Sequence, residues 1–262
     1  MTSKLNCPGA ACSPVRAAMA CGSSAVAALF ILACGSALAG PADYVFVPNV
    51  VKGEREIDFK MGSQKKTDES RASAASLGFG YGVTDNWFTE IYTKYKRENG
   101  APTGFDAFEW ENKFQLTETG KYPIDVGFIT EVERPKDRSE GYEVKFGPLF
   151  QTEFGKTQLN ANVLFQRNYR ADASNTMKLQ YQWQAKYRLM PVFEYGAQGF
   201  GELGNWNHIA DRTDQSHLLG PAIFGRYSLG DGHAIAYNAA YLVDAGDTKH
   251  SNTFRMQVEY EF

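Results

Sequence analysis

Polar and apolar residues alternate along most of this 262-residue chain with a period of two. The clearest run is Met177-Lys-Leu-Gln-Tyr-Gln-Trp-Gln-Ala-Lys-Tyr-Arg-Leu189, in which all thirteen positions follow the alternation. Such alternation is typical of β-strands with one apolar and one polar face. No stretch after Glu54 keeps a 3.6-residue period. The pattern therefore predicts an all-β fold.

The alternating runs predict about twelve strands, at residues 54–64, 72–83, 86–97, 105–117, 123–134, 141–154, 157–169, 177–189, 191–202, 217–229, 233–244 and 252–262. Tight turns, such as 84–86 and 230–232, alternate with longer polar loops, such as 98–104 and 203–216. Strands of about ten residues in even number, with short turns on one rim and long loops on the other, are typical of outer-membrane barrels. We predict a transmembrane antiparallel up-and-down β-barrel; merging or splitting one weak hairpin would give ten or fourteen strands.

Alternation alone does not tell which face of the barrel points outward, because a soluble barrel or sandwich buries its apolar face. Here the polar faces carry long ionic and amide side chains on nearly every strand. Aromatic residues gather near the strand ends, for example Trp87, Phe154, Tyr187 and Phe262 at the short-turn rim, as they do at membrane interfaces. A closed barrel also removes the unpaired strand edges that lipid does not tolerate. We therefore expect the apolar face to contact lipid and the polar face to line a lumen.

The composition agrees with a β-barrel and excludes other classes. Aromatic residues make up 14% of the chain and there are 25 glycines, a mixture that favours strands and tight turns. The formal net charge of −3 argues against a nucleic-acid binder, which would show a basic surplus. The low mean hydropathy argues against a helical membrane protein.

Residues 1–39 have the features of an export signal. An apolar run at 25–33 is followed by Ala37-Leu38-Ala39, the small-x-small pattern that signal peptidase cleaves. The run is shorter than the ~20 residues that a membrane-spanning helix needs. We predict a cleaved signal peptide over 1–39, a periplasmic N-terminal segment or partial plug over 40–53, and the barrel over 54–262.

All four cysteines lie within the predicted signal peptide, at Cys7, Cys12, Cys21 and Cys34. The mature chain would then have no thiol, which excludes disulfides, thiolate metal ligands and thiol catalysis. A poor lipobox at 31–34 would instead make Cys34 a lipid-anchored N-terminus, which is the less favoured alternative.

The last residues carry a resemblance to known proteins. Met256-Gln-Val-Glu-Tyr-Glu-Phe262 resembles the terminal β-signal of Gram-negative outer-membrane proteins, which ends on an aromatic residue after alternating apolar positions. The mature chain as a whole resembles the twelve-stranded channel families of proteobacteria. Leu219-Gly220-Pro221 and the last two strands resemble the family named for the MetA pathway of phenol degradation. The resemblance implies an outer-membrane channel or uptake role and assembly by the barrel-assembly machinery through the C-terminal strand; it supplies no catalytic residues.

If Phe262 faces lipid, every second residue of each strand lines the lumen. The residues predicted to line the pore are Lys178, Lys186, Arg188, Glu109, Glu111, Glu131, Glu133, Glu143, Lys145, Arg226 and Arg255. Acids concentrate on the fourth to sixth strands and cations on the eighth, so opposed charge across the lumen would orient a dipolar or zwitterionic solute. In a second interpretation, the charges pair across neighbouring strands and fill the interior as a salt-bridged core.

A catalytic site is poorly supported by the sequence. Acyl hydrolysis needs a hydroxyl nucleophile beside a histidine that a third group orients. Only Ser216, His217 and Asp214 offer these groups close together, but adjacent residues of a strand point to opposite faces. The chain also has no Gly-x-Ser-x-Gly elbow. We expect no enzyme activity.

The longest loop offers the best candidate metal ligands, Asn207, His208, Asp211 and Asp214, which are suited to a divalent cation such as Ca²⁺. A solvated polar loop is the better interpretation, so we expect no metal and no cofactor. The predicted function is a passive outer-membrane channel for small hydrophilic or amphipathic solutes, with lipid and solute as partners and no nucleic acid. The alternatives are a plugged barrel that is structural or binds a partner through its loops and, less favoured, an outer-membrane lipid hydrolase.

Overall fold

The computed structural model describes residues 40–66, 70–246 and 251–262. The predicted signal peptide with its four cysteines, and His250, lie outside these residues. The elements are β1 (Arg55–Lys65), β2 (Arg71–Thr84), β3 (Trp87–Glu98), β4 (Gly104–Gln115), β5 (Asp125–Pro135), the short 3₁₀ helix η1 (Arg138–Glu140), β6 (Tyr142–Phe154), β7 (Thr157–Tyr169), β8 (Lys178–Met190), β9 (Phe193–Asn205), β10 (His208–Ile209), β11 (Ser216–Gly230), β12 (His233–Asp244) and β13 (Asn252–Glu261).

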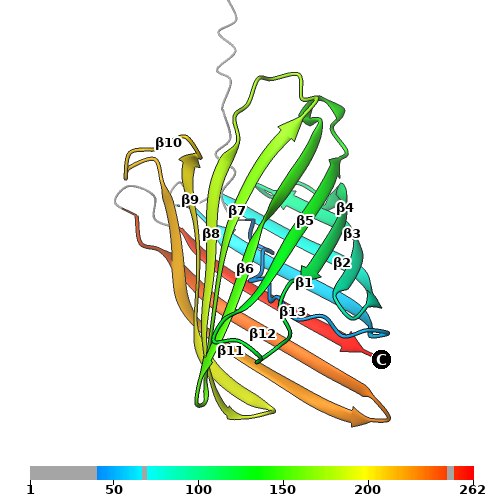
Figure 1. Cartoon of the computed structure of the whole chain (residues 1–262). Coiled ribbons are helices and arrows are strands. Elements are labelled where there is room, and N and C mark those ends of the chain that lie inside the picture. The colour runs from blue at the N-terminus through cyan, green and yellow to red at the C-terminus, as the bar shows by residue number, and fades with distance from the viewer. Residues whose placement is uncertain (1–39, 67–69, 247–250) are drawn as a thin grey trace, which may run out of the picture. The chain divides into compact units, whose positions relative to one another are not determined.

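Twelve of these strands form one closed antiparallel barrel (Figure 1). Each pairs with its neighbours in the chain, and β13 pairs with β1 to close the ring. The thirteenth, β10, is a two-residue strand that folds back onto the end of β9, so β9 continues the barrel by pairing with β11. The predicted fold class and twelve-strand count are confirmed. They could be predicted because the alternation with a period of two defines each strand from nearby residues alone.

The two rims of the barrel differ. Turns of two residues join β2 to β3, β6 to β7, β8 to β9 and β11 to β12 at one rim, where only the connection 116–124 is longer. Longer loops join the strands at the opposite rim, drawn at the top of Figure 1. The C-terminal Phe262 lies at the short-turn rim, where its amide donates to the carbonyl of Arg55 at 2.9 Å. In outer-membrane barrels the short turns face the periplasm.

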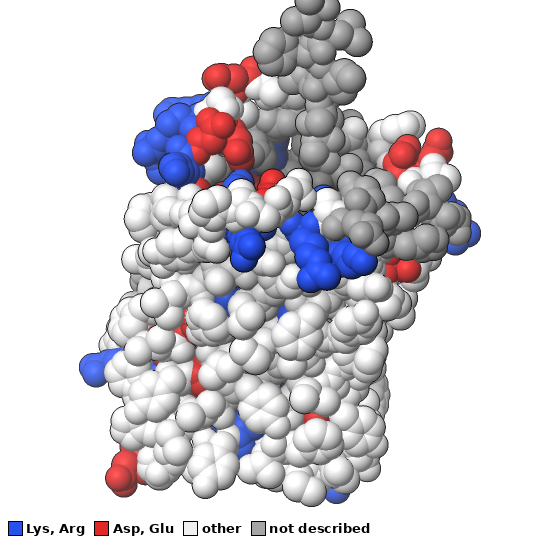
Figure 2. Space-filling model, turned by 180° about the vertical axis from the view of Figure 1, so that it is seen from behind, with Lys and Arg blue, Asp and Glu red and all other residues white. Residues whose placement is uncertain are grey.

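The outer face of the barrel is a broad apolar belt. Leu77, Phe79, Ile91 and Trp110 are each more than half exposed, at 51%, 53%, 61% and 52%. Figure 2 shows this belt as a surface almost free of charge, with charged side chains gathered toward one rim. No helix among the described residues is long and apolar enough to cross a bilayer. Apolar surface this extensive marks contact with another apolar phase, so the strands face lipid, and a soluble sandwich is excluded.

The inner face is polar and falls into two parts. Strands β6–β9 contribute a row of buried amides that hydrogen-bond across strands, including Gln151, Gln158, Asn160, Asn162, Gln182, Gln184 and Gln198. Strands β1 and β3–β6 contribute most of the buried acids and lysines. The lumen wall therefore has an amide side and a charged side.

Candidate functional site

Three glutamates lie side by side on the charged side of the lumen. Glu90 of β3 is directly opposite Glu111 of β4, which is opposite Glu131 of β5. All three are buried, at 3%, 2% and 4% exposure. Like charges in such cross-strand positions destabilise a sheet. The fold therefore requires cations or proton donors next to this row.

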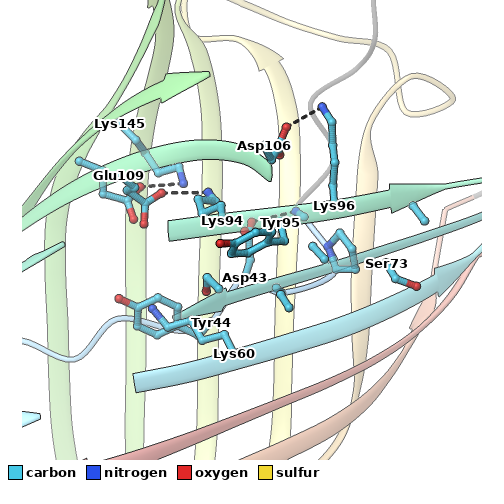
Figure 3. Close-up of a pocket in the computed structure, with 18 of the residues that line it drawn as sticks. Asp43, Tyr44, Lys60, Ser73, Lys94, Tyr95, Lys96, Asp106, Glu109 and Lys145 are labelled. Atoms are coloured by element: carbon cyan, nitrogen blue, oxygen red, sulfur yellow. Dashed lines mark hydrogen bonds and ion pairs between the residues drawn. The ribbon is translucent and has the colours of Figure 1, made fainter. Parts of the chain in front are cut away.

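One lysine neutralises a glutamate of the row, and a second pairs with the acids beside it. Lys145, which faces Glu131 across β5 and β6, binds its carboxylate at 2.7 Å. Lys94 of β3 binds Glu109 at 2.9 Å and Glu133 at 2.5 Å. Figure 3 shows the Lys94–Glu109 pair beside Lys145. These contacts leave Glu90 and Glu111 to other partners.

The third lysine, Lys60 of β1, lies among aromatic rings. It is 3% exposed and its Nζ is 3.1 Å from the carboxylate of Asp58. The Tyr92 hydroxyl donates to the same carboxylate at 2.8 Å. The Lys60 Nζ also lies 3.4 Å from the ring centroid of Tyr44 (Figure 3). An ammonium over an aromatic face is attracted by the negative face of the ring, and more strongly when water is excluded.

Tyr44 reaches this site from the segment that precedes β1. Its hydroxyl donates to Glu111 at 2.5 Å, which supplies the proton donor that this carboxylate lacks from neighbouring strands. The segment of residues 40–53 runs through the lumen and joins β1 at the short-turn rim (Figure 1). We expected these residues either in the periplasm or in the lumen, and no aromatic contact with the charged row was predicted.

Two apolar patches of the lumen wall hold the segment. Phe46 packs against Ile129, Leu149 and Leu164, three inward residues of β5–β7 that are each fully buried. On the other side, Val45 packs with a second inward cluster, formed by Phe200, Leu218, Ala222, Phe224, Ala240 and Leu242. Adjacent residues of an extended chain point in opposite directions. Tyr44–Phe46 therefore spans the lumen between two walls.

Backbone contacts fix the path of the segment. Asn162 donates to the carbonyl of Phe46 at 3.0 Å. Gln115 accepts from the amide of Val50 at 2.8 Å. A Cβ atom at Gly82 would lie 2.0 Å from the carbonyl oxygen of Val51, so this inward position of β2 requires glycine for the segment to approach.

The segment divides the lumen into two cavities that share Tyr44 as a wall. The first, of about 270 Å³, lies toward the long-loop rim and is lined by Asp43, Lys60, Lys94, Lys96 and Asp106, among others (Figure 3). The second, of about 350 Å³, lies toward the short-turn rim. Tyr44 therefore lies between the two cavities.

The residues predicted to line the pore all occupy inward positions, but most of the cations among them are paired with acids one or two strands away and do not form one cationic wall. On β8, Lys178 binds Glu202 at 3.0 Å, Lys186 binds Glu194 at 3.0 Å, and Arg188 binds Glu153 at 2.6 Å. The remaining predicted cations have other partners: Arg226 pairs with Glu261, and the Arg255 guanidinium lies 4.6 Å from the ring centroid of Phe200. Within the part of the chain that the structure describes, Glu143 has no ion pair. Tyr44, Phe46 and Tyr92 were not predicted from the sequence to belong to the site.

The residues considered for catalysis and metal binding do not assemble. Both ring nitrogens of His217 are occupied, Nδ1 by the Tyr181 hydroxyl at 2.7 Å and Nε2 by Gln215 at 2.9 Å. Among the described residues, carboxylates close enough to share a metal ion occur only at Glu109, Glu111 and Glu131. These three already have the partners Lys94, Tyr44 and Lys145. The described loop residues around His208 form no such cluster.

Two porins and an outer membrane channel are among the solved structures that are similar to this barrel. The KdgM porin, in complex with disordered oligogalacturonate, matches with a TM-score of 0.53 and 9% identity over 79% of this chain and 99% of that one. The NanC porin matches with a TM-score of 0.56 and 12% identity over 79% of this chain and 100% of that one. An outer membrane channel from Pseudomonas putida F1 matches with a TM-score of 0.55 and 11% identity over 84% of this chain and 97% of that one.

No protein-family model matches the sequence, and no curated protein matches it. At these identities the structural likeness establishes a shared fold, and function has to be argued from the lumen itself. The fold and the apolar belt together identify a barrel of the Gram-negative outer membrane.

Proposed function

We propose that this protein is a passive channel that carries small hydrophilic or amphipathic solutes across the outer membrane, with Tyr44 at its narrowest point. The observation that carries the proposal is the pair of polar cavities that approach Tyr44 from opposite rims. A solute crossing the barrel passes from one cavity to the other beside this ring. The charged and amide walls supply the hydrogen-bonding groups that replace its hydration.

The dimensions and charge of the lumen support small solutes rather than polyanions. The two cavities lie near the lower end of the ~300–1,000 Å³ range of small-molecule sites. The buried charged groups of the lumen are mostly carboxylates. A polyanion such as the oligogalacturonate bound by the KdgM porin would meet repulsion here. The predicted pore-lining residues contribute paired charges, for example at Lys178, Lys186, Glu109 and Glu133. A solute that passes them can replace one partner of an ion pair after another.

Single-channel recording of the refolded chain, processed at its predicted cleavage site, tests the proposal. We expect small discrete conductance steps, and larger steps for Tyr44→Ala, because removing the ring widens the narrowest level of the lumen. Tyr44→Phe is the matched control, since it keeps the ring and should leave the step size nearly unchanged. A correctly folded barrel that stays silent with all three chains would overturn the proposal.

The apolar patches that hold Val45 and Phe46 favour a second candidate function. Burial of both side chains stabilises the segment in the lumen by a few kcal/mol, which suits a barrel that is closed in its resting state and contacts partners through its long loops. This candidate predicts that the wild-type chain is silent and that Tyr44→Ala alone conducts. In both cases we infer that β13, which ends at Phe262, is recognised by the barrel-assembly machinery and that the belt binds outer-membrane lipid.

A further inference from the structure

The cavity near the short-turn rim has an excess of negative charge. Six carboxylates and three cations line it: Glu54, Glu56, Glu90, Glu194, Glu259 and Glu261, with Lys113, Lys186 and Arg226. Two of the cations are committed, because Lys186 binds Glu194 at 3.0 Å and Arg226 binds Glu261. Four carboxylates then remain for one cation. The imbalance is larger than in the cavity toward the long-loop rim, which five carboxylates and four lysines line.

The remaining cation does not resolve the imbalance. The Lys113 Nζ lies 4.8 Å from the ring centroid of Phe88 and has no ion pair among the described residues. Glu54, just outside β1, shows the effect of the crowding, since burial and the neighbouring Glu261 raise its pKa. Removing carboxylates from water without enough cations is costly. An additional positive charge in the cavity would offset this cost.

A buried acceptor atom points to the same conclusion independently. Glu90 lines the cavity, is only 3% exposed, and its Oε1 has no hydrogen-bond partner. Two more residues of the cavity wall, Glu261 and Asn238, also carry a buried oxygen without a donor. A buried oxygen without a donor loses the hydrogen bonds that water would give it, which is unfavourable. The cavity thus has too few N–H donors for its buried oxygens, as well as too little positive charge.

An ammonium group supplies both, because it has three N–H donors, a positive charge and no acceptor. A divalent metal ion fits less well. Among the described residues, only Glu109, Glu111 and Glu131 have carboxylate oxygens close enough together for one ion, and none of these lines this cavity. An organic cation can span carboxylates that lie further apart. Phe224, an inward residue of β11 that also lines the cavity, suits its alkyl part.

We propose that the cavity between Tyr44 and the short-turn rim is a binding site for a small organic amine, recognised by Glu56, Glu90 and Glu259. This proposal deepens the proposed function, on which it rests, by naming amines as the solute class. The site lies on the path through the barrel, and the ammonium group pairs with carboxylates that have no cation of their own.

The test uses 1,4-diaminobutane as the probe and the uncharged 1,4-butanediol as its matched control. Binding to the refolded chain in detergent micelles is measured by titration calorimetry, and block of single-channel current is measured in planar bilayers. We expect the diamine to bind and to reduce the current, and the diol to do neither. Both effects should weaken at higher salt, because dissolved cations compete for the carboxylates and screen the attraction that draws the diamine into the cavity.

The variant Glu56→Gln/Glu259→Gln removes two negative charges from the cavity, and we expect it to weaken diamine binding about tenfold or more. Glu98→Gln/Asp106→Asn removes two charges from the other cavity and should change binding less than about twofold. Glu56→Gln alone serves if the double variant does not fold. Absence of diamine binding, equal binding of the diol, or equal weakening by both double variants would overturn the proposal.

The outcomes for the site and for the channel are distinguishable. If the chain conducts but neither binds the diamine nor is blocked by it, the proposed function stands and the amine site is overturned. A silent barrel that binds the diamine with the expected dependence on Glu56 and Glu259 overturns the channel and supports the site. Tight binding of Mg²⁺ in place of the diamine, lost in the same variant, overturns the amine site in favour of a metal site.

Discussion

Lys60 joins the barrel wall to the segment that lies inside it. It binds Asp58 on its own strand and lies over the rings of Tyr44 and Tyr92. A buried lysine is retained only where its charge is fully compensated. The same charge compensates the glutamates of the neighbouring row, so the side chain contributes both to the barrel and to the docked segment.

Lys60→Met keeps the length of the side chain and removes its charge. We expect it to lower the free energy of unfolding by about 3–5 kcal/mol, because breaking a buried ion pair leaves Asp58 uncompensated. Urea unfolding in detergent micelles measures the loss. Lys121→Met is the control, since the Lys121–Glu118 pair is on the surface, and it should change stability by less than about 0.5 kcal/mol. A similarly small effect of Lys60→Met would contradict the role given to the charge.

At the scale of elements, the strands could be predicted from the sequence and the segment of residues 40–53 could not. Each strand is defined by alternation within a few residues. The contacts of the segment are not local: Tyr44 and Glu111 are 67 residues apart, and Phe46 and Asn162 are 116 apart.

One signal for the docking site was nevertheless present in the sequence. Ile129, Leu149 and Leu164 are apolar residues on the polar faces of their strands. An apolar residue in a lumen is costly unless something covers it, so such an interruption predicts an occupant. The occupant itself could not be identified, because Tyr44-Val-Phe-Val47 has no polar face and fits equally with the start of a strand.

Phe46→Ala tests whether the segment is held as a unit. We expect the loss of about 3–5 kcal/mol of packing free energy to release the segment while leaving the barrel folded. Limited proteolysis followed by mass spectrometry should then show rapid trimming within residues 40–53. Phe46→Leu keeps most of the apolar volume and should stay protected. If both variants were trimmed as slowly as the wild type, the patches would not be what holds the segment.

At the scale of the whole molecule, the barrel has its apolar residues outside and its polar residues inside, the reverse of a soluble protein. The belt outside is apolar and the wall inside is hydrogen-bonded or ion-paired. The orientation of the faces was predictable from the aromatic residues near the strand ends. The pairing of Lys178, Lys186 and Arg188 with β6 and β9 was not, because register and side-chain conformation decide which of several nearby acids each cation reaches.

Leu77→Arg tests the lipid-facing assignment. Leu77 lies near the middle of β2 and is 51% exposed on the outer face. We expect arginine there to lower the free energy of unfolding in bilayers by about 2–4 kcal/mol. Ala101→Arg, in the loop between β3 and β4, should have little effect. Equal stability of the two variants in lipid vesicles would place Leu77 outside the hydrocarbon region.

The seam between β1 and β13 has a consequence for the order of assembly. It joins residues from opposite ends of the chain; Asp58 and Gln257, which hydrogen-bond across it, are 199 residues apart. Pairing over so long a separation costs much chain entropy, so we expect it to follow the formation of the local hairpins. Residues 40–53 lead directly into β1, so they accompany the strand that closes last. We therefore expect the lumen to acquire its occupant during closure, through the open seam, so that barrel formation and segment docking occur together.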